Sequence, residues 1–329
     1  MAAGSLAATG TAQAGDGGVV TSIRPLGMIA AALTEGVTEP SILLQDGASP
    51  HHYAMKPSDM RALDSARLVV WVGPDLERFL AKPLERTEVP QVILMPAKSA
   101  MHDEEAHQDE AHEHEHEHEH EHEHEHDEPE HHAHEELADA HGHDEAHEEH
   151  AGDEHDHGGL DVHPWLDPMT GLAVAQDMLP QLIEAYPDQE AIIRDNFARF
   201  EASLKAADQD IRAMLAPLKE RGFYVFHDAY TGFVTHYGLK QLGYFTVDPG
   251  RQPGARHLAE IRAALEQNQA ACVMTEPQFS TALVERITDG LPLKTEEIDP
   301  LAAGVELSET AYVDYMLDLA SRFERCLAP

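Results

Sequence analysis

Residues 101–159 limit the fold of this chain more than any other segment, because they cannot supply a hydrophobic core. Between His102 and His157 there are 19 histidines, 25 acidic residues and no lysine or arginine. Residues 113–126 consist of seven consecutive Glu-His pairs. As a strand, this alternation would place imidazoles on one face and carboxylates on the other, so neither face could be buried. We therefore expect a disordered loop, inserted into a chain that folds on either side of it.

Charge excludes one class of partner for the whole chain. The 329 residues include 61 acidic and 22 basic side chains, which gives a formal net charge of -39 at pH 7. Outside the insert, 36 acidic residues still face 22 basic ones. Such a surface repels a phosphate backbone, so we expect no nucleic-acid partner. No apolar run approaches the ~18 residues of a membrane-spanning helix, so no transmembrane segment is predicted.

The remaining sequence predicts two α/β units, because short β-prone apolar runs alternate with helical patterns on both sides of the insert. Before the insert, strands are expected at residues 19–23, 41–44, 68–72 and 92–95, and helices at 25–35, 57–66 and 75–81. After it, strands are expected at 223–226, 243–247, 271–275 and 293–298, and helices at 232–237, 257–268, 280–289 and 308–327. This alternation is typical of parallel sheets covered by helices. The predicted fold class is α/β, with two lobes that each hold a parallel sheet flanked by helices.

A long helix is predicted between the two units. Residues 188–220 place apolar side chains at i, i+3 and i+4 spacing, contain no glycine, and have their only proline, Pro217, near the end. One rigid helix joining the lobes is the simpler interpretation, and the alternative is a pair of helices broken near residues 205–210. The predicted domains are a signal remnant or disordered N-terminus (1–17), an N-terminal lobe (18–187, including the 101–159 loop), the linking helix (188–220) and a C-terminal lobe (221–329).

Two features bear on the cellular compartment. The first fourteen residues are small and mostly apolar and end in Ala12-Gln13-Ala14, which resembles a signal-peptide cleavage site, although a basic start is missing. Export is therefore expected, with a plain disordered N-terminus as the alternative. The chain has two cysteines, Cys272 in a strand-like run and Cys326 at the end of the last helix. They are either two buried free thiols or a disulfide formed in an oxidising compartment.

Six histidines lie outside the insert, and some of them follow predicted strands. These six are His51, His52, His163, His227, His236 and His257. His51 and His52 follow the second strand, and His227 follows the first strand of the second lobe. His163 lies just beyond the insert and before the next helix, and Asp299 follows the last strand. Sites in open α/β sheets lie at these carboxyl ends, so we expect the groups to converge in the cleft between the lobes. Singly, each also fits a hydrogen-bonded loop residue or a turn, and His236 and His257 have no stronger claim than that.

Several short segments together resemble a known family. The segments are GASPHHYAMKPSD, LVVWVGPDLE, DVHPWLDP, FHDAYTGF, TEPQF and IDPLAAG. In this order they resemble the metal-binding substrate-binding proteins of ABC importers, and more narrowly the ZnuA-type periplasmic zinc-binding group, from about residue 18 to the C-terminus. The resemblance implies an exported periplasmic monomer, not an enzyme, that binds Zn²⁺ in the cleft between two lobes joined by a rigid helix. It also implies delivery of the ion to a membrane permease.

The resemblance also implies a ligand set and a disulfide. The ligands carried over residue by residue are His51, His163 and His227, with Asp299 at the position of the family's carboxylate. Some members have a glutamate before the first histidine, whereas this chain has Pro50, so the fourth position falls to Asp299 or to water. His52 is the alternative to its neighbour His51. The family's paired cysteines correspond to Cys272 and Cys326.

Zinc is favoured over other metals, and two other functions remain open. Related manganese importers carry a glutamate where this chain has His227, whereas three imidazoles suit four-coordinate Zn²⁺. A zinc hydrolase would also use three histidines and an open position, but no motif supplies its general base. A zinc buffer or chaperone would bind mainly through the insert. In a transport protein, the insert is instead expected to hold weaker secondary sites, at His112, His114, His116, His118, His120, His122, His124 and His126.

Overall fold

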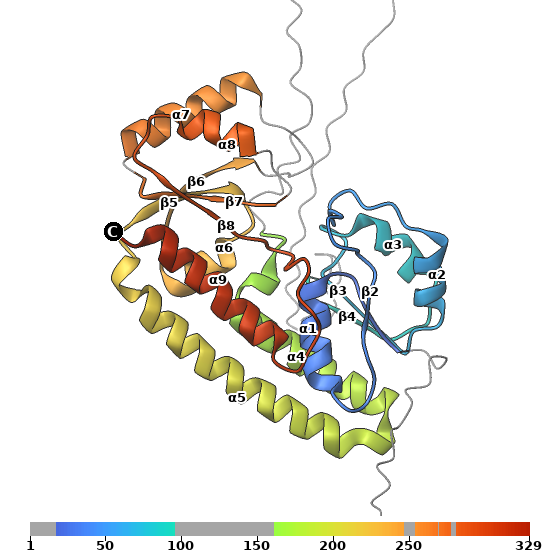
Figure 1. Cartoon of the computed structure of the whole chain (residues 1–329). Coiled ribbons are helices and arrows are strands. Elements are labelled where there is room, and N and C mark those ends of the chain that lie inside the picture. Colours follow the sequence, from blue (N-terminus) through green and yellow to red (C-terminus); the bar gives the residue numbers. More distant parts are fainter. Residues whose placement is uncertain (1–17, 96–160, 247–253, 269, 278–280) are drawn as a thin grey trace, which may run out of the picture. The chain divides into compact units, whose positions relative to one another are not determined.

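A computed structural model describes residues 18–95, 161–246, 254–268, 270–277 and 281–329 (Figure 1). The predictions for the N-terminal residues 1–17 and for the loop at 101–159 lie outside these residues. They include the signal remnant, the disorder of the loop and its weak zinc sites.

The N-terminal lobe contains a parallel four-stranded sheet in the order β2-β1-β3-β4. Its strands are β1 (Val19–Thr21), β2 (Ser41–Ile42), β3 (Leu68–Trp71) and β4 (Gln91–Ile93), and its helices are α1 (Arg24–Thr34), α2 (Pro57–Asp64) and α3 (Arg78–Leu84). Every residue of β1 and β3 is buried. Continuous apolar runs of this kind mark strands covered on both faces, which confirms the predicted parallel sheet.

The C-terminal lobe repeats this arrangement, with the order β6-β5-β7-β8. Its strands are β5 (Gly222–His227), β6 (Lys240–Thr246), β7 (Cys272–Thr275) and β8 (Lys294–Glu297), and its helices are α6 (Thr231–Tyr237), α7 (Ala255–Asn268), α8 (Thr281–Thr288) and α9 (Ala311–Leu327). Strand β6 begins three residues before its predicted start. It lies at the edge of the sheet, where polar residues such as Lys240 and Gln241 are tolerated, so hydrophobicity alone does not reveal its beginning.

Two helices connect the lobes, α4 (Pro168–Ala185) and α5 (Glu190–Leu215). Helix α5 is continuous over 26 residues, which confirms one linking helix and excludes a break near residues 205–210. It is shorter than the predicted 188–220 because short 3-10 turns flank it, the second containing Pro217, whose missing amide cannot continue the α-helical pattern. The sequence indicated α4 only as a helix following His163. Among the helices of the described ranges, none combines the length and apolar character that a membrane span requires.

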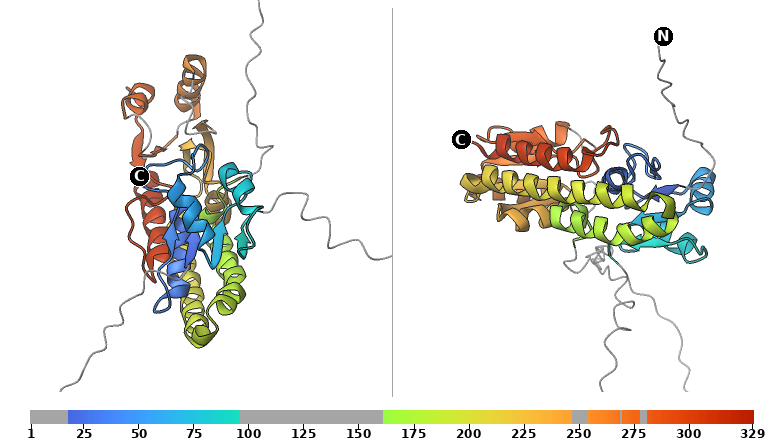
Figure 2. Two further views of the ribbon diagram at one scale, coloured as in Figure 1. Left: turned by 90° about the vertical axis from the view of Figure 1, so that its right-hand side faces the viewer. Right: turned by 90° about the horizontal axis from the view of Figure 1, so that it is seen from below.

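The largest hydrophobic core runs through both lobes. It takes one face of each sheet, for example Val70 of β3 and Val225 of β5, together with buried residues of α1, α4, α5 and α9. Figures 1 and 2 show α5 running along both lobes, beside α4 and α9. The opposite faces have separate clusters, around Trp71 in the first sheet and Phe226 in the second. The two lobes therefore share one core, and each sheet packs against a separate cluster on its other face.

A disulfide joins Cys272 of β7 to Cys326 near the end of α9, with a Cα–Cα distance of 5.6 Å. Both cysteines are buried. The bond ties the last helix to a central strand of the second sheet across a sequence separation of 54 residues. The pairing implied by the family resemblance is confirmed, and the alternative of two free thiols is wrong.

Candidate metal centre

The first histidine of the site lies on the loop after β2. Leu43 and Leu44 extend the pairing with β1, since their amides donate to the carbonyls of Thr21 and Ser22. The chain then turns, and the amide of His51 donates to Oγ of Ser49 at 3.3 Å. This turn leaves the His51 side chain half-buried against the cavity, while His52 is exposed. The structure thus favours His51 over its neighbour as the inward-facing imidazole.

The second histidine, His227, is the last residue of β5, a central strand of the second sheet. It is 2% exposed. Within the described residues, neither ring nitrogen has a hydrogen-bond partner, although Oε1 of Glu276 lies 3.7 Å from Nδ1. An imidazole buried with both nitrogens unsatisfied is costly, and a bound cation is one way to satisfy it.

The third histidine, His163, stands immediately before the short 3-10 turn Pro164–Leu166 and is also buried. Oδ1 of Asp161 accepts a hydrogen bond from the His163 amide at 2.9 Å and lies 3.1 Å from its Nδ1. The other carboxylate oxygen accepts from the amide of Gly232 at the start of α6. Trp165 Nε1 donates to the carbonyl of Pro300 at 2.7 Å. This segment precedes the linking helix in sequence, but its hydrogen bonds hold it to the C-terminal lobe.

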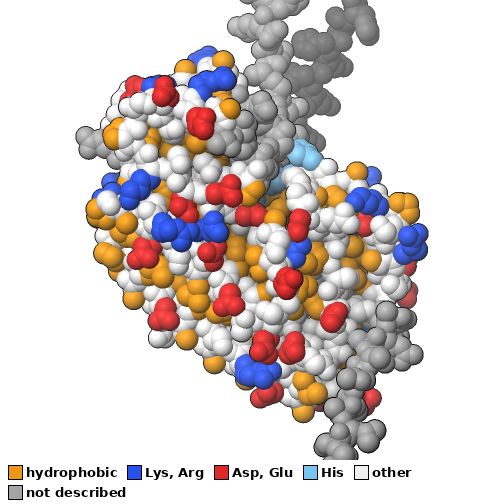
Figure 3. All heavy atoms as spheres, viewed as in Figure 1, with side chains coloured by type: hydrophobic (Ala, Val, Ile, Leu, Met, Phe, Trp, Pro, Cys, Tyr) orange, Lys and Arg blue, Asp and Glu red, His pale blue; other side chains and the backbone are white. Residues whose placement is uncertain are grey.

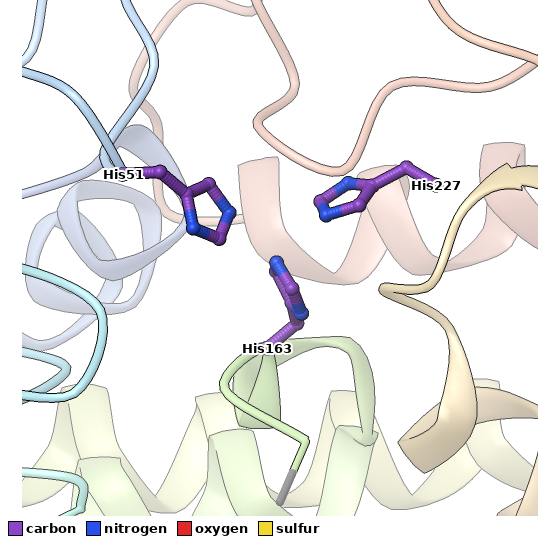
Figure 4. Close-up of side chains that lie close together, drawn as sticks. All are labelled: His51, His163 and His227. Atoms are coloured by element: carbon purple, nitrogen blue, oxygen red, sulfur yellow. The ribbon is translucent and has the colours of Figure 1, made fainter. Parts of the chain in front are cut away.

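The three imidazoles face one another, as Figure 4 shows. Their ring centroids are 5.5 Å apart for His51 and His163, 5.5 Å for His51 and His227, and 4.7 Å for His163 and His227. One ring nitrogen from each residue belongs to a set whose members all lie within 4.8 Å of one another. Three convergent nitrogen donors match the preference of Zn²⁺ for imidazole, with one coordination position left. The structure thus brings together all three histidines predicted from the sequence.

These histidines line a cavity of about 250 Å³. Its other walls include Pro50 from the loop of the N-terminal lobe, Trp165, and Leu301 and Ala303 from the loop after β8. In the space-filling view, a histidine surface is visible between the two lobes (Figure 3). The cavity is mostly apolar around its nitrogen donors, which strengthens electrostatic interactions inside it.

Asp299, the predicted carboxylate ligand, also lines the cavity but is not part of the three-histidine set. Its Oδ1 accepts a hydrogen bond from the amide of Leu301 at 2.9 Å, and its Oδ2 accepts one from the amide of Ala303 at 2.7 Å. A carboxylate oxygen has a second lone pair, so these bonds orient Asp299 without preventing coordination. Its role as the fourth ligand stays a prediction.

The other histidines of the described chain hold structural contacts. His236 Nε2 lies 2.6 Å from Oδ1 of Asp208 on α5, and its Nδ1 lies 3.3 Å from Oδ1 of Asp167. His257 Nε2 lies 2.9 Å from the carbonyl oxygen of Phe245. Both placements agree with the structural interpretation from the sequence.

Two carboxylates beside the site were not singled out from the sequence. Asp161 stands two residues before His163, a spacing at which an aspartate often accepts from the backbone amide two positions on. Glu276 directly follows β7, at the same sheet edge as His227, and is 2% exposed. The position of Glu276 after a buried strand was a usable signal, since polar groups at these ends converge. Its proximity to His227 depends on strand order and could not be read from the sequence.

Comparison with known proteins gives one consistent family. The family described as "Zinc-uptake complex component A periplasmic" (ZnuA) matches residues 19–326. A "High-affinity zinc uptake system protein ZnuA" from Yersinia pestis is 37% identical over 318 residues, covering 94% of this chain and 91% of the relative. A protein of the same name from Haemophilus influenzae is 39% identical over 312 residues, covering 94% and 93%. A crystal structure of ZnuA is similar with a TM-score of 0.67 and 22% identity, covering 94% of this chain and 99% of that one.

Proposed function

The chain belongs to the ZnuA family of periplasmic zinc-uptake components, and on this premise we propose that it captures Zn²⁺ for a high-affinity ABC importer. The observation that carries the proposal is the convergence of His51, His163 and His227 on one cavity. In this role zinc is cargo: the protein binds it and hands it to a membrane permease. The protein acts in the periplasm as a monomer.

The donor set supports zinc over manganese. Three neutral imidazoles provide borderline-soft nitrogen ligands, whereas Mn²⁺ prefers sites rich in oxygen. Asp299 or a water molecule completes a four-coordinate shell. Copper would bind the same nitrogens more tightly by intrinsic order, so its exclusion depends on geometry and availability.

The cavity offers little support for hydrolysis. A zinc hydrolase needs a metal-bound water and a positioned general base. Among the described residues that line the cavity, Asp299 is the only acidic one. Coordination by Asp299 would remove both the open position and the base. We therefore propose a binding protein without catalytic activity.

The position of the cavity fits delivery to a partner. Its walls come from the loop after β2 in one lobe and from the loop after β8 in the other. A permease that contacts both loops could therefore alter the site by separating them. Such a contact would convert tight capture into release without any change in the ligands themselves.

Zinc titration against a competing chelator tests this function. The proteins are the full chain, a chain lacking residues 101–159, and each of these with His227→Ala. We expect one tight site in both parent chains, at least about tenfold weaker binding with His227→Ala in both, and additional weak sites only in the full chain. His52→Ala serves as the matched control and should leave the tight site unchanged.

The same titration separates capture for transport from simple buffering. If deletion of residues 101–159 abolishes tight binding, the insert is the main binder and the protein is a zinc buffer. Tight binding that survives His227→Ala in the deleted chain would contradict the proposed ligand set.

A further inference from the structure

Two of the three histidines have a carboxylate against Nδ1. For His163 this is Asp161, with Oδ1 at 3.1 Å. For His227 it is Glu276, with Oε1 at 3.7 Å. Each carboxylate lies outside the set of atoms that converge on the cavity centre. They therefore contact the histidines from behind and do not act as ligands in this arrangement.

Glu276 is held in place behind His227. Its side chain is completely buried, and Oε1 accepts a hydrogen bond from the hydroxyl of Tyr230 at 3.1 Å. Tyr230 is itself fully buried. Burying a carboxylate costs free energy unless its surroundings stabilise it, and next to an imidazole the natural compensation is the ring N–H.

Asp161 is anchored from both sides. One oxygen accepts from the His163 amide at 2.9 Å, and the other accepts from the amide of Gly232 at 3.1 Å. The orientation of Asp161 is therefore fixed before any metal binds.

We infer that Asp161 and Glu276 are positioning residues that set the tautomer and orientation of His163 and His227. A neutral imidazole has one N–H and one lone pair, so an acceptor at Nδ1 selects the N–H there and leaves the Nε2 lone pair for the ion. The carboxylate also makes the imidazole a stronger donor to the metal. For His227 the 3.7 Å separation is an ion-pair distance, longer than a hydrogen bond, so the role requires the ring and Oε1 to approach each other when the ion binds. The inference rests on the proposed zinc site and adds the residues that preorganise it.

Glu77 provides a matched control for a buried carboxylate. It follows β3, which holds the place in the first sheet that β7 holds in the second. Its Oε2 accepts from the amides of Val72 at 2.7 Å and Gly73 at 3.2 Å. Glu77 thus satisfies backbone donors in a comparable position, away from the three histidines.

The test measures zinc affinity of the full chain at less than one equivalent of zinc, so that only the tightest site is loaded. We expect Glu276→Gln to weaken binding about tenfold, because the amide oxygen still accepts from Nδ1–H but carries no charge. Glu276→Leu should weaken it by up to about 100-fold, and Asp161→Asn by about tenfold. Glu77→Gln should stay within twofold of the parent.

A second measurement separates positioning from a structural role. With one equivalent of Co²⁺, the visible absorption of the Glu276→Gln protein should shift. The neutral amide makes the His227 imidazole a weaker donor, and this changes the ligand field of the ion. Thermal unfolding of the metal-free variants reports any general loss of stability, and Glu276→Gln preserves the shape of the side chain if Glu276→Leu does not fold. Parent-like zinc affinity and an unchanged Co²⁺ spectrum in folded Glu276→Gln would overturn the inference.

The His227→Ala variant, measured in the same way, distinguishes a failure of the positioning role from a failure of the proposed function. If His227→Ala loses tight binding while the Glu276 and Asp161 variants retain it, the site stands and the positioning role is wrong. If His227→Ala also binds as tightly as the parent, the proposed site itself is wrong.

Discussion

The two lobes share a strand order but supply their histidines differently. In the N-terminal lobe, His51 comes from a loop nine residues beyond the end of β2 and is half-buried. In the C-terminal lobe, His227 belongs to the central strand β5, and His163 is pinned beside it through Asp161, Gly232 and Trp165. Equal topology therefore does not produce equal rigidity. The C-terminal side offers two of the proposed ligands already in place, and the N-terminal side adds the third from a loop.

The buried carboxylates differ in the same way. Glu77 and Glu276 follow equivalent strands of the two sheets, yet Glu77 accepts from backbone amides and Glu276 lies against an imidazole. A carboxylate buried after a strand can therefore accept hydrogen bonds from the backbone of its own loop or orient a nearby imidazole. The partner that the chain places beside it decides between them.

The largest expected effect comes from the disulfide, which the described part of the N-terminal lobe does not have. Replacing Cys272 and Cys326 together by alanine should lower the free energy of unfolding by about 4 kcal/mol, as expected for a closed loop of this length. Because the lobes share one core, denaturant unfolding should still show one transition, shifted to lower denaturant. The parent protein under reducing conditions is the control. Two separated transitions would show that the lobes unfold independently.

The next effect concerns Glu77 and pH. Burial raises the pKa of this carboxyl to about 7, above its ordinary value of 4.5. The folded protein therefore holds a proton that the unfolded chain releases, and the resulting penalty is absent below pH 4.5 and complete above pH 7. As pH rises through this window, the parent should lose up to about 3 kcal/mol of stability relative to Glu77→Gln.

Chemical denaturation of both proteins between pH 4 and pH 8 measures this difference. Comparing the two cancels the contributions of the many other histidines and carboxylates. Parallel stability curves would show that the pKa of Glu77 is the same in the folded and unfolded chains, contrary to the effect of its burial.

The third prediction ranks the ligands. Each of His51→Ala, His163→Ala and His227→Ala should weaken zinc binding at least tenfold, with the two C-terminal-side histidines costing about tenfold more than His51, or about 1.4 kcal/mol. The reason is that a preset ligand contributes its bond without an ordering cost, whereas a loop ligand must be ordered. Chelator competition on the three variants measures the order. Equal losses of zinc affinity in the three variants would contradict the proposed difference between the loop histidine and the two histidines on the C-terminal side.

The smallest effect is expected where the two lobes meet beside the cavity. Oδ1 of Asp46 lies 3.0 Å from Nε of Arg24, and Oδ2 accepts from the amide of Gly304 at 3.1 Å. The second contact joins the His51 loop to the loop after β8, and the first holds Asp46 to α1. The Asp46 side chain is 45% exposed, so Asp46→Asn should cost less than about 1 kcal/mol. Stopped-flow zinc release should then accelerate less than fivefold, and a larger change would make this contact a principal lock on the site.

The sequence by itself determined the elements and the ligand types. Apolar runs in β1, β3, β5 and β7 and the 3.6-residue periodicity of α5 are local patterns, and local sterics and burial are enough to specify them. The positions of His51, His163 and His227 after strands or beside a helix start predicted their convergence, because the carboxyl ends of parallel strands meet at one sheet edge. The polar start of β6 and the ends of α5 were less visible, since edge exposure and 3-10 turns leave no hydrophobic signature.

Only the tertiary structure decided which imidazole faces inward and which lobe holds each proposed ligand. The turn at Ser49 directs His51 and leaves His52 exposed, and the Trp165–Pro300 hydrogen bond spans 135 positions of sequence to hold His163 on the C-terminal side. The approach of Glu276 to His227 likewise depends on β7 lying beside β5. These contacts join residues far apart in the chain, and local periodicity carries no information about them.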